Sequence, residues 1–151
     1  MNENTDNQTD CRLDTCLFFA TTKLSRVFNK IAEETFSMTG LSPSHAFILY
    51  IVNKAGQIHQ KEVGERLLLT PSTVTRFVEK LERKGFVTKQ VEGKNVYLFK
   101  TSQGEAMQTH IVKAWEDLHE IYADILSSKE AQSYIASSGK LLKALEEKGY
   151  Q

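Results

Sequence analysis

The chain has 151 residues, of which 40% are hydrophobic and 25% are charged, and these values are typical of one soluble globular domain. Its 19 basic and 19 acidic side chains give no net charge, so the overall balance gives no indication of a DNA partner. No apolar run approaches the roughly 18 residues of a membrane span, and the start has no signal-peptide pattern. We therefore expect a cytoplasmic protein with no membrane partner, with a disordered tail over residues 1–10 and a single domain over residues 11–151.

Two helices are predicted before the middle of the chain. The first covers residues 12–37, where apolar residues recur at alternating spacings of four and three, at Leu13, Leu17, Ala20, Leu24, Val27 and Ile31. A repeat of 3.5 residues gives a continuous apolar seam that suits helix–helix packing. The second begins at Ser42–Pro43, an N-cap followed by a first-position proline, and it is apolar on most faces up to Val52. A helix of that composition is expected to be buried.

A helix-turn-helix is predicted over residues 60–85. Its first helix covers residues 60–67, and its second begins after Thr70, which can cap it, with Pro71 at the first helical position. Gly85 ends the second helix, because glycine enters the left-handed conformation without steric cost. Two short helices joined by a tight turn present the second helix to DNA.

The second helix of this pair carries side chains that suit a DNA major groove. Its apolar residues share one face, namely Val74, Phe77, Val78 and Leu81. Small hydroxyl residues and Arg76 occupy the other face at the start of the helix. Hydroxyls can reach phosphates or bases, and arginine can bond guanine O6 and N7 together. An ordinary amphipathic surface helix is the alternative interpretation of this segment alone.

A β-hairpin is predicted directly after the helix pair. Residues 86–90 and 96–100 are rich in β-branched and aromatic side chains, and they flank the polar, glycine-containing connection 92–95. Helix, turn, helix and hairpin in this order form a winged helix, so residues 42–100 are predicted to be a DNA-binding lobe. The predicted fold class is mainly α with a small β-hairpin wing.

Further helices are predicted over residues 101–148. The apolar seam recurs there at Met107, Ile111, Ala114, Leu118, Ile121 and Ile125, and an amphipathic segment follows near residues 131–147. Other apolar residues give these helices a second apolar side. We therefore predict that residues 12–37 and 101–148 are dimerisation helices that flank the winged lobe. The alternative is that they complete the core of one larger monomer.

The distribution of charge supports a nucleic-acid interface on the winged segment. Residues 57–100 hold nine Lys and Arg against five Glu. Residues 1–56 hold five basic against six acidic residues, and residues 101–151 hold five against eight. Positive charge thus gathers where phosphates would be met.

The sequence has no signature of enzymatic or metal chemistry. Cys11 and Cys16 are too few and too close for a disulfide framework, and without a secretory signal they indicate a reducing cytosol. The four histidines lack metal-ligand spacing, and no nucleophile–base pair or phosphate loop is recognisable. We expect no cofactor, no metal site and no enzymatic activity.

Residues 71–87 and the Thr-x-x-Gly segment at 101–104 resemble the MarR family of bacterial transcription regulators, and the likeness covers about residues 12–148. The resemblance implies a homodimeric regulator, most often a repressor, on a pseudo-palindromic operator in double-stranded DNA. It also implies small aromatic ligands that bind between the lobe and the dimer helices and weaken DNA binding. Residues that it assigns to base edges and phosphates of the major groove are Ser72, Thr73, Thr75 and Arg76. Residues that it assigns to the DNA backbone are Lys61, Lys80 and Arg83.

The chain departs from that family at the wing, and two functional alternatives stay open. The wing tip lacks the arginine that family members insert into the minor groove, and Lys94 is the cation it offers instead. Cys16 stands where one branch of the family carries a peroxide-sensing cysteine, so a thiol-based redox-sensing repressor is one alternative. The other is a winged helix that binds proteins and not DNA. Aromatic residues that could line an effector pocket are Phe18, Phe28, Phe47 and Tyr50.

Overall fold

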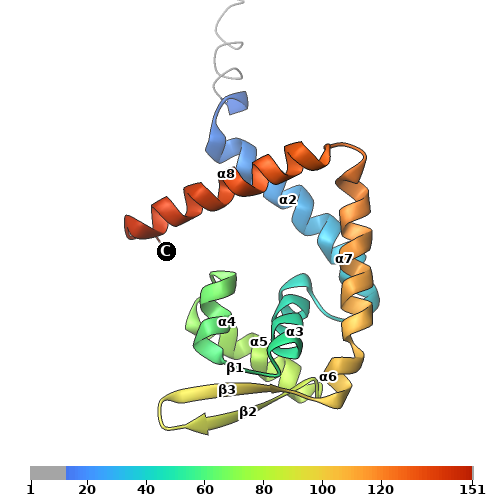
Figure 1. The fold of residues 1–151 in the computed structure, drawn as a ribbon, viewed down its shortest axis with the longest axis vertical. Coiled ribbons are helices and arrows are strands. Elements are labelled where there is room, and N and C mark those ends of the chain that lie inside the picture. The colour runs from blue at the N-terminus through green and yellow to red at the C-terminus, as the bar shows by residue number, and fades with distance from the viewer. Residues whose placement is uncertain (1–12, 151) are drawn as a thin grey trace, which may run out of the picture.

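The structure of the protein is a computed structural model that describes residues 13–150, and it confirms a mainly helical winged fold (Figure 1). The disordered tail predicted over residues 1–10 lies outside the described residues. Among residues 13–150, no helix has the length and apolar character that a membrane crossing requires. In chain order, the elements are α2 Leu17–Phe36, η1 Ser37–Thr39, α3 Pro43–Ala55, β1 Gln57–His59, α4 Gln60–Leu67, α5 Pro71–Arg83, β2 Val87–Glu92, β3 Asn95–Lys100, α6 Ser102–Ala106, α7 Gln108–Ala123 and α8 Ser128–Glu147.

The first long helix begins later than its apolar seam predicts. Cys16 has an extended backbone (φ −85°, ψ 116°) and precedes α2, so Leu13 is separated from the helix that carries the rest of the seam. The end agrees well with the predicted boundary, because α2 continues to Phe36 and leads into the short turn η1. Phe36 is the single residue of α2 that is buried.

The winged lobe is built around one buried cluster. α3 supplies the centre, as its nearly continuous apolar sequence predicts. α5 and the sheet pack against α3, and α4 packs against α5 and the sheet. The cluster includes, with no or almost no exposed surface, Ala46, Ile48, Leu49, Val52, Val63, Val74, Val78, Leu81, Val87 and Leu98. Burial of that many aliphatic side chains fixes the positions of α4 and α5 relative to each other.

The wing contains one strand more than the sequence predicts. The sheet is antiparallel with the order β1–β3–β2, and Ile58 of β1 pairs with Leu98 of β3, both of them buried. The hairpin tip is also tighter than predicted, because Glu92 pairs with Asn95 and leaves a two-residue turn. Gly93 has φ +62°, whereas Lys94 does not have a positive φ, and a glycine at the first central position is typical of type II′ hairpin turns.

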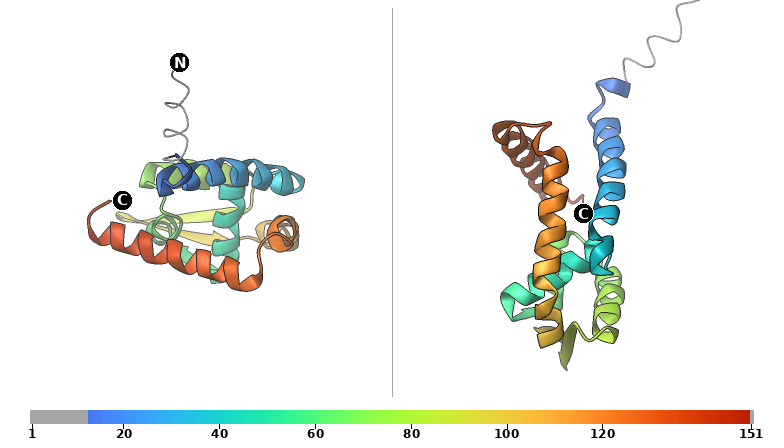
Figure 2. Two further views of the ribbon diagram at one scale, coloured as in Figure 1. Left: turned by 90° about the horizontal axis from the view of Figure 1, so that it is seen from above. Right: turned by 90° about the vertical axis from the view of Figure 1, so that its right-hand side faces the viewer.

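The helices outside the lobe leave much apolar surface uncovered. The predicted helix after residue 101 is divided at Met107 into α6 and α7, and α7 packs against α2. α8 begins at Ser128, ahead of the predicted start, with a capping box between Ser127 and Glu130. Figures 1 and 2 show α8 turning back after α7 and crossing the end of the molecule remote from the wing. None of its residues is buried.

Candidate nucleic-acid interface

The turn between α4 and α5 brings the two helices into close contact. Leu68 ends α4 in the left-handed conformation (φ 51°), and the N–H of Leu69 donates to the Gly64 carbonyl at 2.9 Å. A Cβ on the buried Gly64 would lie 3.1 Å from the Val74 side chain, so the absence of a side chain there permits the close approach. The connection between residues 67 and 70 is therefore short, as predicted, and α4 and α5 form a helix-turn-helix.

The start of α5 is capped as its sequence predicts. Thr70 has an extended backbone, and its Oγ1 accepts a hydrogen bond from the N–H of Thr73 at 3.4 Å. Pro71 occupies the first helical position. Gly85 follows the helix with φ +76°, where a side chain would be strained. Caps at both ends thus delimit a helix of 13 residues.

α5 buries one face and exposes the other. Val74, Val78 and Leu81 are at most 1% exposed, so they anchor the helix in the lobe. The exposed residues of α5 include Ser72, Thr75, Arg76, Lys80 and Arg83, five of the eight residues predicted to contact DNA. Lys61 and Lys94 are exposed as well, and Thr73 is partly buried.

The cations of α5 are available to a ligand. In the described part of the chain, none of Arg76, Lys80 and Arg83 takes part in an ion pair. The Arg76 guanidinium instead lies over the Phe77 ring, 5.4 Å from its centroid. Lys61 differs, because its Nζ lies 3.8 Å from the Glu65 carboxylate. An anionic ligand would thus meet three unneutralised cations on one exposed helical face.

The hydroxyls of α5 are less available than the sequence indicates. Thr75 Oγ1 donates to the Pro71 carbonyl at 2.9 Å and accepts from Gln60 Nε2 at 3.1 Å. Thr73 Oγ1 lies 2.9 Å from Thr70 Oγ1, and Ser72 Oγ lies 3.3 Å from the same oxygen. Sequence alone could not reveal these contacts, since they depend on rotamers and on the placement of Gln60 in α4.

Beneath the α5 cations lies a buried histidine. His45 of α3 is 6% exposed, and its ring centroid is 4.5 Å from that of Phe77. Burial lowers the pKa of His45 below its ordinary value of 6.5, and the nearby charges of Lys80, Arg76 and Lys84 lower it further. Its Nε2 has no hydrogen-bond partner within the described chain. The imidazole therefore binds a proton less readily than a free histidine does, below a positively charged surface.

We expect this histidine to make the fold less stable in acid. Because the folded protein binds a proton at His45 more weakly than the unfolded chain does, the free energy of unfolding should decrease as the pH falls below 6.5. Urea unfolding at about pH 7.5 and about pH 5.5, in the protein and in His45→Gln, measures this contribution. The variant should lose less stability on acidification, and equal losses in both proteins would contradict the assignment to His45.

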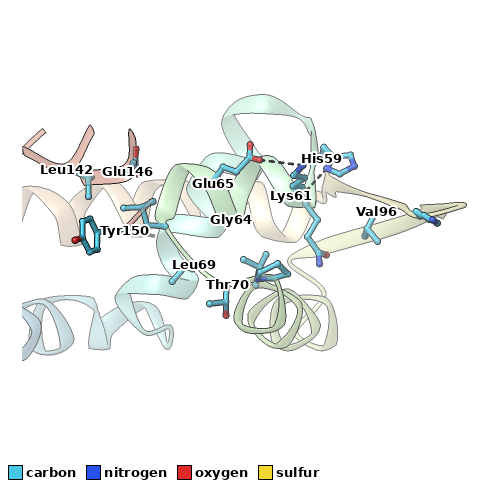
Figure 3. Close-up of a pocket in the computed structure, with 15 residues that line it drawn as sticks. His59, Lys61, Gly64, Glu65, Leu69, Thr70, Val96, Leu142, Glu146 and Tyr150 are labelled. Carbon is cyan, nitrogen blue, oxygen red and sulfur yellow. Dashed lines mark hydrogen bonds and ion pairs between the residues drawn. The ribbon is translucent and has the colours of Figure 1, made fainter. Parts of the chain in front are cut away.

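A groove of about 780 Å³ separates the helix-turn-helix from the last turns of α8. Figure 3 shows His59, Lys61 and Glu65 on its lobe side and Leu142, Glu146 and Tyr150 on its α8 side. Lys94 of the wing tip also lines it. Of the predicted DNA-contacting residues, Lys61 and Lys94 therefore flank the groove, whereas the α5 cations lie outside its lining.

The four predicted effector-pocket residues lie in three separate aromatic groups. Phe47 and Tyr50 each lie 5.2 Å from the Trp115 ring, and Tyr50 and Trp115 line a hollow of about 490 Å³ between α3 and α7. Phe28 contacts Tyr122 on α7 at 5.8 Å. Phe18 is 69% exposed near the start of α2, against Phe19. An effector site remains a prediction, and of the four predicted residues Tyr50 alone lines this hollow.

The predicted redox residue lies at the start of α2. Cys16 carries a free thiol, is half-buried and occupies the N-cap position of the helix. Cys11 lies outside the described residues. A redox function of Cys16 remains a prediction.

Two hydrogen bonds of Thr101, in the Thr-x-x-Gly segment, join the end of α5 to the start of α6. We call this pair of hydrogen bonds the Thr101 latch. Thr101 Oγ1 donates to the Gly85 carbonyl at 2.7 Å and accepts from the Gly104 N–H at 2.9 Å. A Cβ on Gly104 would lie 1.9 Å from the Phe86 carbonyl oxygen. The sequence identified the motif, but only the structure shows that it fixes α5 against the helices outside the lobe.

Comparison with known proteins agrees with this arrangement. The model of the MarR family matches residues 41–92. The chain is similar to the HTH-type transcriptional repressor MdtR of Bacillus subtilis (strain 168), at 25% identity over 129 residues, which cover 82% of this chain and 83% of that protein.

Two solved structures show the same fold. One is the PcaV regulator of Streptomyces coelicolor in complex with its natural ligand (TM-score 0.78, 21% identity, 87% of this chain and 95% of that one). The other is the Staphylococcus aureus MepR–DNA complex (TM-score 0.75, 17% identity, 86% of this chain and 98% of that one).

Proposed function

Because the chain belongs to the MarR family of transcription regulators, we propose that it is a repressor that binds a pseudo-palindromic operator as a homodimer. The observation that carries the proposal is the exposed face of α5, where Arg76, Lys80 and Arg83 stand without acidic partners in the described chain. The solved MepR–DNA complex, which has the same fold, supports it. A cytoplasmic location follows from the proposal, since an operator-binding protein must reach chromosomal DNA.

Within the proposed complex, each of the predicted DNA-contacting residues is assigned to the bases or to the phosphates. Ser72, Thr73, Thr75 and Arg76 lie at the start of α5, the end that enters a major groove in helix-turn-helix proteins. Four cations would contact phosphates. Lys61 and Lys94 lie near the start of α5, and Lys80 and Arg83 lie in its last turn. Residues 42–100 thus form the proposed DNA-binding lobe, and phosphate contacts would set its position on the duplex.

The dimer is proposed from the uncovered apolar surface of residues 12–37 and 101–148. Leu17 and Ile135 are 65% and 69% exposed, and α8 buries none of its residues within the chain. Apolar side chains continue along α8, at Tyr134, Ile135, Leu141, Leu142 and Leu145. Exposed apolar patches on this scale mark interaction sites. We propose that a second copy of the chain packs against this surface. The two-fold symmetry of the resulting dimer would match that of a pseudo-palindromic operator.

We expect two carboxylates on α8 to dissociate this dimer. Ile135→Glu together with Leu142→Glu places charges seven residues apart on one helical face, where they would be buried without partners in the dimer. In sedimentation velocity at micromolar concentration, the unaltered protein should be a dimer and the double variant a monomer. Lys140→Glu, on the same helix, is the matched control and should remain a dimer. A monomeric unaltered protein at this concentration would contradict the proposal.

Release from DNA by a small aromatic effector is part of the proposal. The hollow beside Tyr50 and Trp115 supports it, because it lies where α3 of the lobe meets α7. The ligand-bound PcaV structure has the same fold. A ligand bound between α3 and α7 would change the position of the lobe relative to the dimer helices.

Salt dependence tests DNA binding directly. With about eight phosphate contacts in the dimer, affinity for a labelled duplex should fall about ten-thousandfold between about 50 and about 200 mM salt. Fluorescence anisotropy measures this change, and repeating the titration with simple phenols tests for an effector. Absent or salt-independent binding would favour the alternative of a protein-interaction module.

A further inference from the structure

The hydroxyl of Thr75 is held by residues of both helices in the helix-turn-helix. Its proton is donated to the Pro71 carbonyl one turn earlier in α5, at 2.9 Å. Its oxygen accepts from Nε2 of Gln60, the first residue of α4, at 3.1 Å. Gln60 therefore bridges the two helices and fixes the orientation of the Thr75 side chain.

This arrangement limits what Thr75 can offer to DNA. Guanine N7 and O6, adenine N7, thymine O4 and the phosphate oxygens are all acceptors, and they require a donor. A hydroxyl carries one proton, which Thr75 has already given to Pro71. Thr75 is nevertheless exposed on the proposed DNA-facing side of α5. The other group on its Cβ is a methyl, which is an apolar contact group for the thymine methyl.

We propose that Thr75 recognises a thymine in each operator half-site through a contact between the two methyl groups, and that Gln60 is the residue that positions it. The inference rests on the proposed operator binding and adds a specific base to it. Thr75 precedes Arg76 in the chain, so the thymine lies close to the guanine that Arg76 contacts. Readout at the two positions is complementary, because arginine bonds polar base edges and threonine detects an apolar group.

Deoxyuridine substitution tests this contact, because it removes the thymine methyl and preserves base pairing. The substrate is the duplex that the purified protein enriches from a random-sequence library, with each thymine replaced in turn. The unaltered protein should bind about three- to fivefold more weakly when one particular thymine of either half-site is replaced, as expected for one lost methyl contact.

Variants at position 75 identify the group responsible. We call the loss of affinity on replacing that thymine with deoxyuridine the deoxyuridine penalty. Thr75→Val preserves the methyl and removes the hydroxyl, so it should show the same deoxyuridine penalty as the unaltered protein. Thr75→Ser preserves the hydroxyl and removes the methyl, so it should show no penalty at that thymine. The opposite pattern, with the penalty lost in Thr75→Val and retained in Thr75→Ser, would overturn the proposal.

Gln60→Ala tests the positioning role. Without the bridge, the Thr75 side chain is free to rotate, so the penalty at the one thymine should decrease while binding to random-sequence DNA stays the same. Gln57→Ala, at an exposed position of β1, is the matched control and should retain the penalty in full. An unchanged penalty in Gln60→Ala would show that Gln60 does not position the Thr75 side chain.

The outcomes also separate this inference from the function on which it rests. If a duplex is enriched but no thymine shows a penalty, the methyl contact is wrong and operator binding stands. If no sequence is enriched, the proposed function itself fails.

Discussion

The variant Gly104→Ala is expected to lose about 3 kcal/mol or more of unfolding free energy. The new Cβ would lie 1.9 Å from the carbonyl oxygen of Phe86 and 2.8 Å from its carbonyl carbon. Both are backbone atoms, so no side-chain rotation can relieve the overlap. The chain would have to separate α6 from the end of α5 and break the Thr101 latch, which holds the Gly85 carbonyl at 2.7 Å.

Urea unfolding of this variant needs a control for the change from glycine to alanine itself. Gly139 serves that purpose, because it lies within α8 and a Cβ there meets nothing within 4 Å. Gly139→Ala should stabilise the protein slightly, by up to about 1 kcal/mol, through higher helix propensity. If both variants unfold at the same urea concentration as the unaltered protein, the latch does not have the role given to it here.

The variant Arg76→Ala is expected to weaken binding to the operator by about 1–3 kcal/mol and to relax base preference at one position per half-site. The guanidinium is exposed, stacked on Phe77 at 5.4 Å and free of ion pairs in the described chain. It can therefore bond guanine O6 and N7 without first breaking an existing ion pair. The measurement is a competition between the operator and duplexes altered at single positions.

Arg83→Ala separates specificity from general attraction on the same helix. Arg83 lies two turns further along α5 and is assigned to phosphate. Its loss should weaken binding to all sequences alike and reduce the salt slope by about two units, one for each subunit of the dimer. If Arg76→Ala leaves the base preference unchanged, the assignment of Arg76 to a base edge is wrong.

Local signals in the sequence predicted the helix-turn-helix well. Thr70, Pro71 and Gly85 specify the two ends of α5 through capping and backbone conformation, which depend on few neighbours. Residues 60–67 were predicted to be helical, and the structure confirms the same bounds for α4. The amphipathic pattern of α5 likewise predicted its buried face, since Val74, Val78 and Leu81 lie in the core.

Features that depend on long-range contacts were missed or misplaced. β1 has three residues, too few for a strand pattern, and it exists because it pairs with β3. The break before α2 at Cys16 has no marker such as proline or glycine, so the apolar seam predicted a helix continuous with Leu13. The division of the later helix at Met107 has no sequence marker either.

The sequence predicted which residue types occupy the candidate site, but it did not predict their hydrogen bonds. Periodicity placed Ser72 and Arg76 on the exposed face of α5, as the structure has them, and Thr75 is exposed as well. It could not show that the Thr75 hydroxyl is occupied by Pro71 and Gln60. Rotamers and partners from another helix are tertiary information, so a sequence pattern indicates which groups are present but not which remain free.

Selection of duplexes from a random-sequence library by the purified protein tests the central claim, which is sequence-specific DNA binding by a symmetric pair of α5 helices. The account predicts enrichment of a pseudo-palindrome whose half-sites are about 10 base pairs apart and each contain a guanine close to a thymine. Arg76→Ala should enrich it poorly. Recovery of no common sequence, or of a single half-site without a symmetric partner, would contradict the account.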